Sequence, residues 1–159
     1  MKRIKIFKNS IGKDKRGLIW TSWNENYKIN KKFNHDKFSL SKKNVLRGLH
    51  FDTKSWKLIS CVFGKFYFVV VNFDKNSKNY LKTKTWTLDH KQNKSILIPP
   101  YYANGHLCLS DFCVFHYKMS YRGSYPDVKD QFSIKWNDKR LKIKWPIDKK
   151  RIILSKRDT

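Results

Sequence analysis

Short strand-like runs, with little helical periodicity between them, most constrain how this chain can fold. The clearest runs are KLISCVF (57–63), KFYFVVVNF (65–73) and FCVFHYKM (112–119). Each is bounded by Gly, Asn, Asp or Pro, which favours strands joined by turns. Further runs of this kind lie at 83–88, 95–99, 106–109, 131–136 and 141–144. Strand after strand without intervening helices predicts an all-β antiparallel sandwich or barrel.

Three other observations refine the prediction. Segment 65–73 is nearly continuously apolar, so we expect both of its faces to be covered. A weak pattern indicates one helix near 21–33, and Lys75–Lys84 has the composition of a polar loop. The chain has 159 residues, of which 40% are hydrophobic, and it contains no linker or internal repeat. We therefore expect residues 1–159 to form one domain.

The charge is strongly positive, with 36 Lys and Arg residues against 12 Asp and Glu, a formal net charge of +24. Such a balance favours an anionic partner, either nucleic acid or a substrate that carries a diphosphate. The lysines are spread along the whole chain, as Lys-rich codon bias would also produce, so we expect no specific nucleic-acid partner. No run approaches the twenty apolar residues of a membrane span, and the first ten residues lack the apolar run of a signal peptide. We expect a cytoplasmic protein without membrane association.

The three cysteines, Cys61, Cys108 and Cys113, each lie among apolar neighbours and form no CxxC pair. This usage predicts buried free thiols in a reducing compartment. No Cys/His cluster has the spacing of metal ligands, so we expect no metal site.

Three polar stretches could line a site, namely KKNVLRGLHFD (42–52) and PPYYANGHLCLS (99–110), each of which contains a glycine, and LSKRD (154–158). A small β-barrel offers its interior to one ligand. On a regular strand Arg47 and His50 would face opposite sides, but the intervening Gly48 allows both to approach a cavity. Considered singly, each histidine, tyrosine or aspartate in these stretches is more readily a structural or solvated residue. Only their combination favours a site.

The ordered set of motifs resembles the dTDP-4-dehydrorhamnose 3,5-epimerase family. The set comprises NVLRGLHF, Lys-Leu-Ile followed by Gly six residues on, SILIPPYYANGHLCLS, FHYK, IKWNDKRLKIKWP and LSKRD, over roughly residues 14–158. The resemblance implies a cupin-type jelly roll with a few short helices that works as a homodimer without metal or cofactor. It also implies a nucleotide-diphosphate 4-keto sugar as substrate, inverted at C3 and C5 through an enolate.

The same resemblance implies a role for each motif residue. His50 matches the general base, Asp158 the carboxylate that orients it, and Tyr117 the general acid. The substrate-binding positions are Arg16, Arg47, Lys57, Asn104 and His106. Among them, Arg16 matches an arginine of the nucleotide side, and we expect an N-terminal arm (residues 1–20) to cross to the partner subunit.

Several positions depart from the family pattern. Asp52 stands where the family usually has Gln, and the chain is three residues shorter between His50 and Lys57. A histidine, a carboxylate and a glutamate of the family are replaced by Asn104, Phe68 and Thr21. These departures favour relatives that act on GDP-linked 4-keto heptoses in capsule synthesis. Three alternatives stay open: inversion at C3 only, a keto-isomerase of the same superfamily, and a non-catalytic cupin that binds sugar or nucleic acid.

Overall fold

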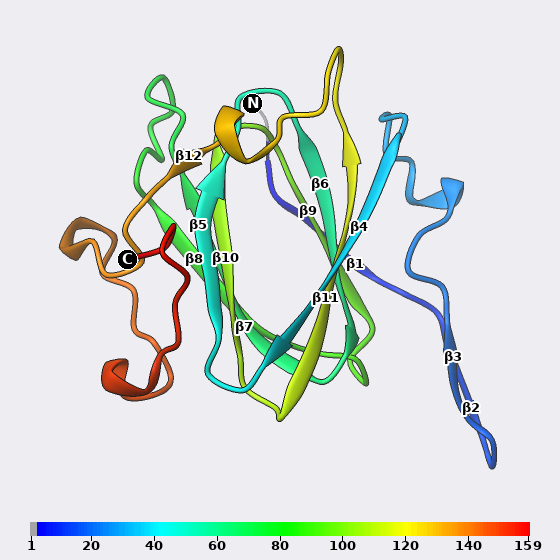
Figure 1. Cartoon of the computed structure of the whole chain (residues 1–159). Helices are drawn as coiled ribbons and strands as arrows, with labels where there is room; N and C mark the ends of the chain where they lie inside the picture. Colours follow the sequence, from blue (N-terminus) through cyan, green and yellow to red (C-terminus); the bar gives the residue numbers. More distant parts are fainter. Residues whose placement is uncertain (1–2) are drawn as a thin grey trace.

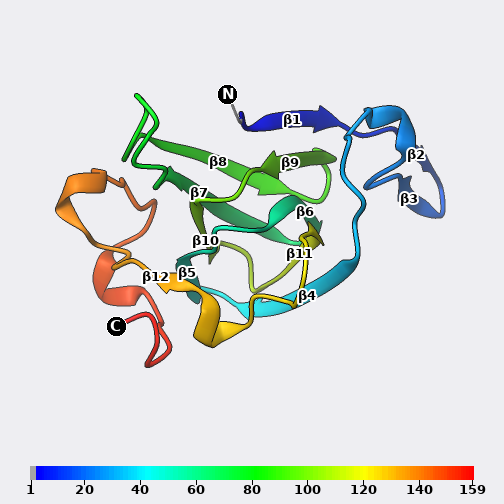
Figure 2. The same cartoon turned by 90° about the horizontal axis from the view of Figure 1, so that it is seen from above.

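The computed structural model describes residues 3–159, in which two five-stranded antiparallel sheets face one another (Figures 1 and 2). One sheet has the order β1 (Lys5–Lys8), β9 (Lys94–Ile98), β6 (Trp56–Phe63), β11 (Phe112–Ser120), β4 (His35–Lys42). The other has the order β12 (Phe132–Ser133), β5 (Leu46–Phe51), β10 (Tyr102–Cys108), β7 (Lys65–Asn72), β8 (Thr83–Asp89). The all-β cupin-type prediction is confirmed.

A separate hairpin and four single-turn helices complete the fold. Strands β2 (Ile11–Asp14) and β3 (Gly17–Trp20) form the hairpin, which projects from the sheets in Figure 1. The 3₁₀ helices are η1 (Glu25–Tyr27), η2 (Val128–Asp130), η3 (Lys139–Leu141) and η4 (Lys149–Arg151). None of the helices within residues 3–159 is long and apolar enough to cross a membrane.

Strand β7 is covered on both faces, as its apolar sequence predicts. Phe66, Phe68 and Val70 belong to the core between the sheets, where residues of β6, β9 and β11 meet them. Val69 and Val71 belong to a second cluster on the other face of the sheet. The three cysteines are buried and free, also as expected.

The prediction was wrong in three segments. Residues 141–144 form no strand, because Leu141, Ile143 and Trp145 pack against the second cluster without a strand partner. The run 131–136 shortens to the two residues of β12, and the helix near 21–33 is only the single turn η1. For residues 141–144 the alternating apolar pattern reflects packing against this cluster and does not determine a hydrogen-bonding partner.

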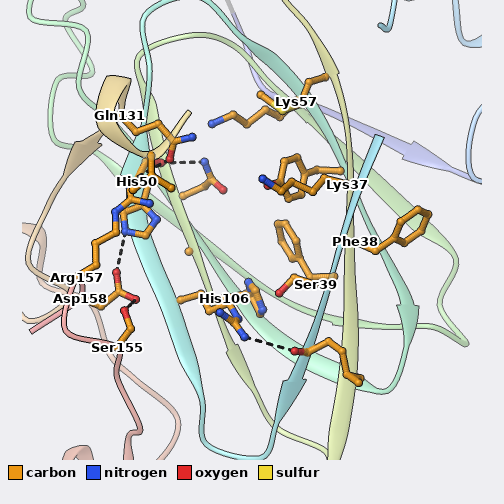
Figure 3. Close-up of a pocket in the computed structure, with 18 of the residues that line it drawn as sticks. Lys37, Phe38, Ser39, His50, Lys57, His106, Gln131, Ser155, Arg157 and Asp158 are labelled. Atoms are coloured by element: carbon orange, nitrogen blue, oxygen red, sulfur yellow. Dashed lines mark hydrogen bonds and ion pairs between the residues drawn. The ribbon is translucent and has the colours of Figure 1, made fainter. Parts of the chain in front are cut away.

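The sequence did not predict strand β4, because its polar residues face the interior and its apolar residues face outward. It is an edge strand with Lys37 and Ser39 directed into the space between the sheets, whereas Phe38 is turned away (Figure 3). Phe38 and Leu40 are each 62% exposed. The polar inner face of β4 opens the interior of the sandwich to water and prepares a cavity there.

Strand β1 pairs with β9 of its own chain, from Lys5 opposite Leu97 to Lys8 opposite Lys94. This part of the expected N-terminal arm therefore belongs to the sheet of its own subunit. The hairpin β2–β3 is the part that extends away from it (Figure 2).

Candidate active site

A cavity of about 520 Å³ lies between the two sheets and is bounded on one side by the C-terminal segment (Figure 3). Seven of the predicted site residues line it: Arg47, His50, Lys57, Asn104, His106, Tyr117 and Asp158. They come from β5, β6, β10, β11 and the C-terminal segment, so the fold gathers motifs that are far apart in the sequence.

Arg47 and His50 reach the same cavity because β5 and β10 are out of regular register. Asn104 pairs with His50 but His106 pairs with Arg47, so β5 carries one extra residue in this interval. Two glycines allow the strands to meet there: a Cβ at Gly48 would lie 2.6 Å from the Cα of Gly105. Gly48 also has a φ of 124°, which favours glycine. The expected break at Gly48 in the alternation of side chains along the strand is confirmed.

His50 and Asp158 form a close pair at one wall of the cavity. Nε2 of His50 lies 2.7 Å from Oδ1 of Asp158, and Ser155 Oγ donates to the other carboxylate oxygen at 2.9 Å. Burial acts to raise the pKa of Asp158, but His50, Ser155 and Arg157 outweigh it and hold that pKa below its usual range. A carboxylate oxygen only accepts hydrogen bonds, so this pairing favours the tautomer with the proton on Nε2 and leaves Nδ1 as the nitrogen that can act as a base.

Lys57 lies in the cavity wall beside a second carboxylate. Its Nζ is 3.1 Å from Oδ2 of Asp52, and the Lys57 and Asp52 side chains are only 10% and 2% exposed. Burial acts to raise the pKa of Asp52, but the charge of Lys57 and the amides of Lys54 and Ser55 outweigh burial, so the pKa of Asp52 lies below its usual range. Asp52 is therefore ionised at neutral pH and faces the Lys57 Nζ.

Tyr117 enters the cavity from β11, in the sheet opposite His50. Burial, together with the neighbouring Tyr125, raises the pKa of the Tyr117 phenol well above its ordinary value. Tyr125 accepts a hydrogen bond from Lys37 Nζ at 3.0 Å. Tyr117 is therefore a protonated phenol at neutral pH.

The remaining predicted residues form the floor of the cavity. Arg47 Nε donates to Ser41 Oγ at 3.0 Å, and the same hydroxyl is hydrogen-bonded to His106 Nε2 at 3.3 Å. Burial, and secondarily the charge of Arg47, lowers the pKa of His106 to about 3, so its ring is neutral. Asn104 Nδ2 donates to the carbonyl of His50 at 3.1 Å, which ties β10 to the base.

Three cations at the cavity have no carboxylate within 4.0 Å among residues 3–159. They are Lys37, Arg47 and Arg157, of which Arg157 Nη2 donates to Gln131 Oε1 at 3.2 Å. Lys57, by contrast, is compensated by Asp52. The cavity thus has a net positive charge that favours an anionic ligand.

Arg16 is the predicted site residue that the fold keeps away from the cavity. It lies in the turn of hairpin β2–β3, where it pairs with Asp14 and its side chain is 84% exposed. Within one chain it therefore contributes nothing to the site.

Sequence reasoning also missed several lining residues: Lys37, Tyr125, Gln131, Ser155 and Arg157. Ser155 and Arg157 lie inside the LSKRD motif and could have been found there. Lys37 and Tyr125 lie outside every motif that was singled out, and only the pairing of β4 with β11 brings Lys37 next to Tyr117.

Known proteins share both the sequence and the fold. A family model described as dTDP-4-dehydrorhamnose 3,5-epimerase matches residues 1–159. The enzyme of that name from Escherichia coli (strain K12) is 34% identical over 155 residues, which cover 91% of this chain and 80% of that relative. The enzyme from Salmonella typhimurium is 33% identical over 149 residues, 89% of this chain and 80% of that relative.

Solved structures extend this similarity. A dTDP-6-deoxy-D-glucose-3,5-epimerase from Legionella pneumophila, in complex with dTDP-4-keto-L-rhamnose, has a TM-score of 0.88 and 31% identity and covers 98% of this chain and 84% of that one. A 3'-monoepimerase from Streptomyces bikiniensis shares the fold, with a TM-score of 0.86, 23% identity, and 98% and 80% coverage. By sequence and by structure, this chain belongs to the dTDP-4-dehydrorhamnose 3,5-epimerase family of enzymes.

Proposed function

We propose that this protein inverts C3 and C5 of a nucleotide-linked 4-keto sugar by removing and returning protons through an enolate. The observation that carries the proposal is that His50 and Tyr117 reach one cavity from opposite sheets. Inversion requires that a proton leave one face of the sugar and that another arrive at the opposite face. A base and an acid on facing walls suit that requirement.

The first step is removal of the hydrogen next to the ketone. Nδ1 of His50 takes the proton, and the electrons of the C–H bond move to the 4-keto oxygen to form an enolate. Asp158, whose lowered pKa keeps it ionised, stabilises the imidazolium that results. The ammonium of Lys57 can donate to the enolate oxygen, which lowers the barrier at the moment when the charge develops.

The second step returns a proton to the other face. Tyr117 gives its phenolic proton to the carbon as the enolate electrons form the new C–H bond and the ketone is restored. Burial and Tyr125 keep this phenol protonated until the enolate forms. His50 then releases its proton to solvent and Tyr117 regains one from solvent. A second round at the other carbon completes the double inversion, whereas a 3'-monoepimerase performs only one.

The substrate class follows from the charge of the cavity and from the relatives. A diphosphate suits the uncompensated cations Lys37, Arg47 and Arg157. The relatives named above support a dTDP-linked sugar, and none of them is named for a GDP-linked heptose. The departures Asp52, Phe68 and Asn104 are the reason to test a GDP-linked 4-keto heptose beside the dTDP-linked 4-keto-6-deoxy sugar.

The remaining parts of the proposal concern the state of the protein. We propose a homodimer in which Arg16 of the exposed hairpin reaches the site of the partner subunit, since it does not line the cavity described above in its own chain. We propose the cytoplasm as its location, which is supported by three cysteines that stay as free thiols.

Incubation with dTDP- and GDP-linked 4-keto sugars in heavy water tests the function. The number and position of deuterons taken up report the nucleotide preference and distinguish C3-only from C3 and C5 inversion. His50→Asn should reduce exchange at every epimerised carbon by roughly 10²-fold or more. Tyr117→Phe should retain washout of the substrate hydrogen while inversion falls, and Asp158→Asn should lie between the two.

A matched control is available on the outer face of the sheet that carries Tyr117. Nε2 of His116 lies 2.7 Å from Oδ1 of Asp36, the same separation as in the His50–Asp158 pair. His116 neighbours Tyr117 on β11 and therefore faces the opposite side of the strand. His116→Asn should leave exchange unchanged. Near wild-type exchange in His50→Asn, or no exchange by the wild type with any substrate, would contradict the proposal.

A further inference from the structure

We propose that Asp52 is a positioning residue that holds the Lys57 ammonium in place to receive the developing enolate. This inference rests on the proposed function and adds to it a residue that the family pattern does not contain, since Gln usually occupies this position. Asp52 itself lies behind the cavity wall and does not line the cavity, so it acts through Lys57.

The short connection between β5 and β6 is built around the Asp52 side chain. Oδ1 accepts the backbone amides of Lys54 at 2.9 Å and of Ser55 at 2.6 Å, which closes a tight turn of the kind aspartate favours. The shortening by three residues and the change from Gln to Asp therefore form one structural unit. The turn fixes the carboxylate, and Oδ2 is left to face Lys57.

The geometry of the pair constrains the position of the Lys57 ammonium. Nζ lies 3.1 Å from Oδ2 of Asp52, and both side chains are almost fully buried. A lysine side chain has four rotatable bonds, so an unpaired ammonium would sample several positions. With the carboxylate fixed by two backbone amides, the ion pair holds the Lys57 ammonium beside Asp52, and its N–H groups can donate to a substrate oxygen.

The pair also divides the cavity by charge. Asp52 cancels the charge of Lys57, whereas Arg47 and Arg157 have no carboxylate within 4.0 Å in the part of the chain that the structure describes. A diphosphate is therefore drawn to the arginines, and Lys57 stays free of phosphate and available to the ketone. Asp52 in this way contributes both to the position of the ammonium and to the orientation of the sugar.

The test compares Asp52→Asn with the wild type in the heavy-water assay. Asparagine retains Oδ1 for the two turn amides but replaces Oδ2 by an NH₂ group, which cannot accept from Lys57. We expect kcat to fall about 10- to 100-fold, the scale of a misplaced catalytic group, with KM within roughly twofold. The melting temperature should also fall, because Lys57 is left buried without its charge partner, so kcat is compared at a temperature where both proteins are folded. In a Lys57→Met background the same change should have no further effect on kcat.

A control variant removes a similar pair far from the cavity. Asp89, the last residue of β8, accepts the amide of Lys91 at 2.8 Å, and its Oδ2 lies 3.8 Å from Lys65 Nζ. Asp89→Asn should leave kcat and KM unchanged.

The outcomes separate this inference from the proposed function. An active wild type with wild-type kcat in folded Asp52→Asn would overturn the inference alone, as would an undiminished effect in the Lys57→Met background. An inactive wild type would overturn both. If Asp52→Asn does not fold, Asp52→Glu decides: it keeps the charge but moves it by one methylene, and full kcat in that variant would refute the positioning role.

Discussion

His106 should make the folded state sensitive to mild acid, and replacing it should remove that sensitivity. Its ring is 3% exposed and stacks on Phe115, with centroids 4.3 Å apart. Burial, then the charge of Arg47, lowers its pKa to about 3. In the unfolded chain a histidine titrates near pH 6.5, so below that pH the unfolded state binds a proton that the folded state excludes.

The size of the effect follows from linkage. The contribution is fully retained above about pH 6.5 and is lost progressively as the pH falls toward 3, at about 1.4 kcal/mol per pH unit. Between pH 6.5 and 5.0 the free energy of unfolding should therefore fall by about 2 kcal/mol through this residue alone. That is a large share of the stability of an ordinary domain, about 5–15 kcal/mol.

The assay is urea unfolding of the wild type and of His106→Phe at pH 7.5 and pH 5.0. Phenylalanine is apolar and aromatic, so it preserves the stack on Phe115 without a titratable ring. The wild type should lose roughly 1 M more in urea midpoint than the variant between the two pH values. Groups common to both proteins cancel in this comparison. Equal losses in the two proteins would refute the burial of a neutral His106.

Four further outcomes follow from other features. Gly105→Ala places a Cβ 2.8 Å from the carbonyl oxygen of Arg47 and should cost roughly 1–3 kcal/mol in urea unfolding and about 10²-fold in exchange; wild-type values would contradict this. Activity should survive a chelator, and a loss reversed by a divalent ion would count against metal-free chemistry. Nucleic-acid binding should collapse near physiological salt, and salt-resistant, sequence-selective binding would argue for a different function. Analytical ultracentrifugation at micromolar concentration should show a dimer; a monomeric mass would exclude the proposed contribution of Arg16.

The sequence predicts the fold best where burial and backbone pairing coincide. Strand β7 is apolar at almost every position because both of its faces are covered, and its bounds were close to the prediction. The break at Gly48 was also predictable, since a glycine between Arg47 and His50 allows both side chains to share one side. The ordered motifs predicted seven residues that line one cavity, although the sequence alone does not show which strands pair.

The remaining features depend on contacts that no local pattern encodes. Strand β4 has its polar residues inside and its apolar residues outside, the reverse of an ordinary sheet face, because its inner face borders the cavity. Residues 141–144 alternate like a strand yet have no strand partner. Asp52 was recognised only as a departure from the family, because its meeting with Lys57 depends on the tight turn between β5 and β6.

The exposed side of strand β4 has a consequence for how concentrated solutions of the protein behave. Its outer edge pairs with no strand of residues 3–159, and Phe38 and Leu40 are exposed beside it. In dilute buffer the net charge of +24 opposes non-specific association. Salt shortens the range of that repulsion from about 10 Å at 0.1 M to about 3 Å at 1 M, and sulfate strengthens apolar association. Colloidal stability should therefore decline steadily as sulfate is added. Concentrated protein should stay in solution best at low ionic strength.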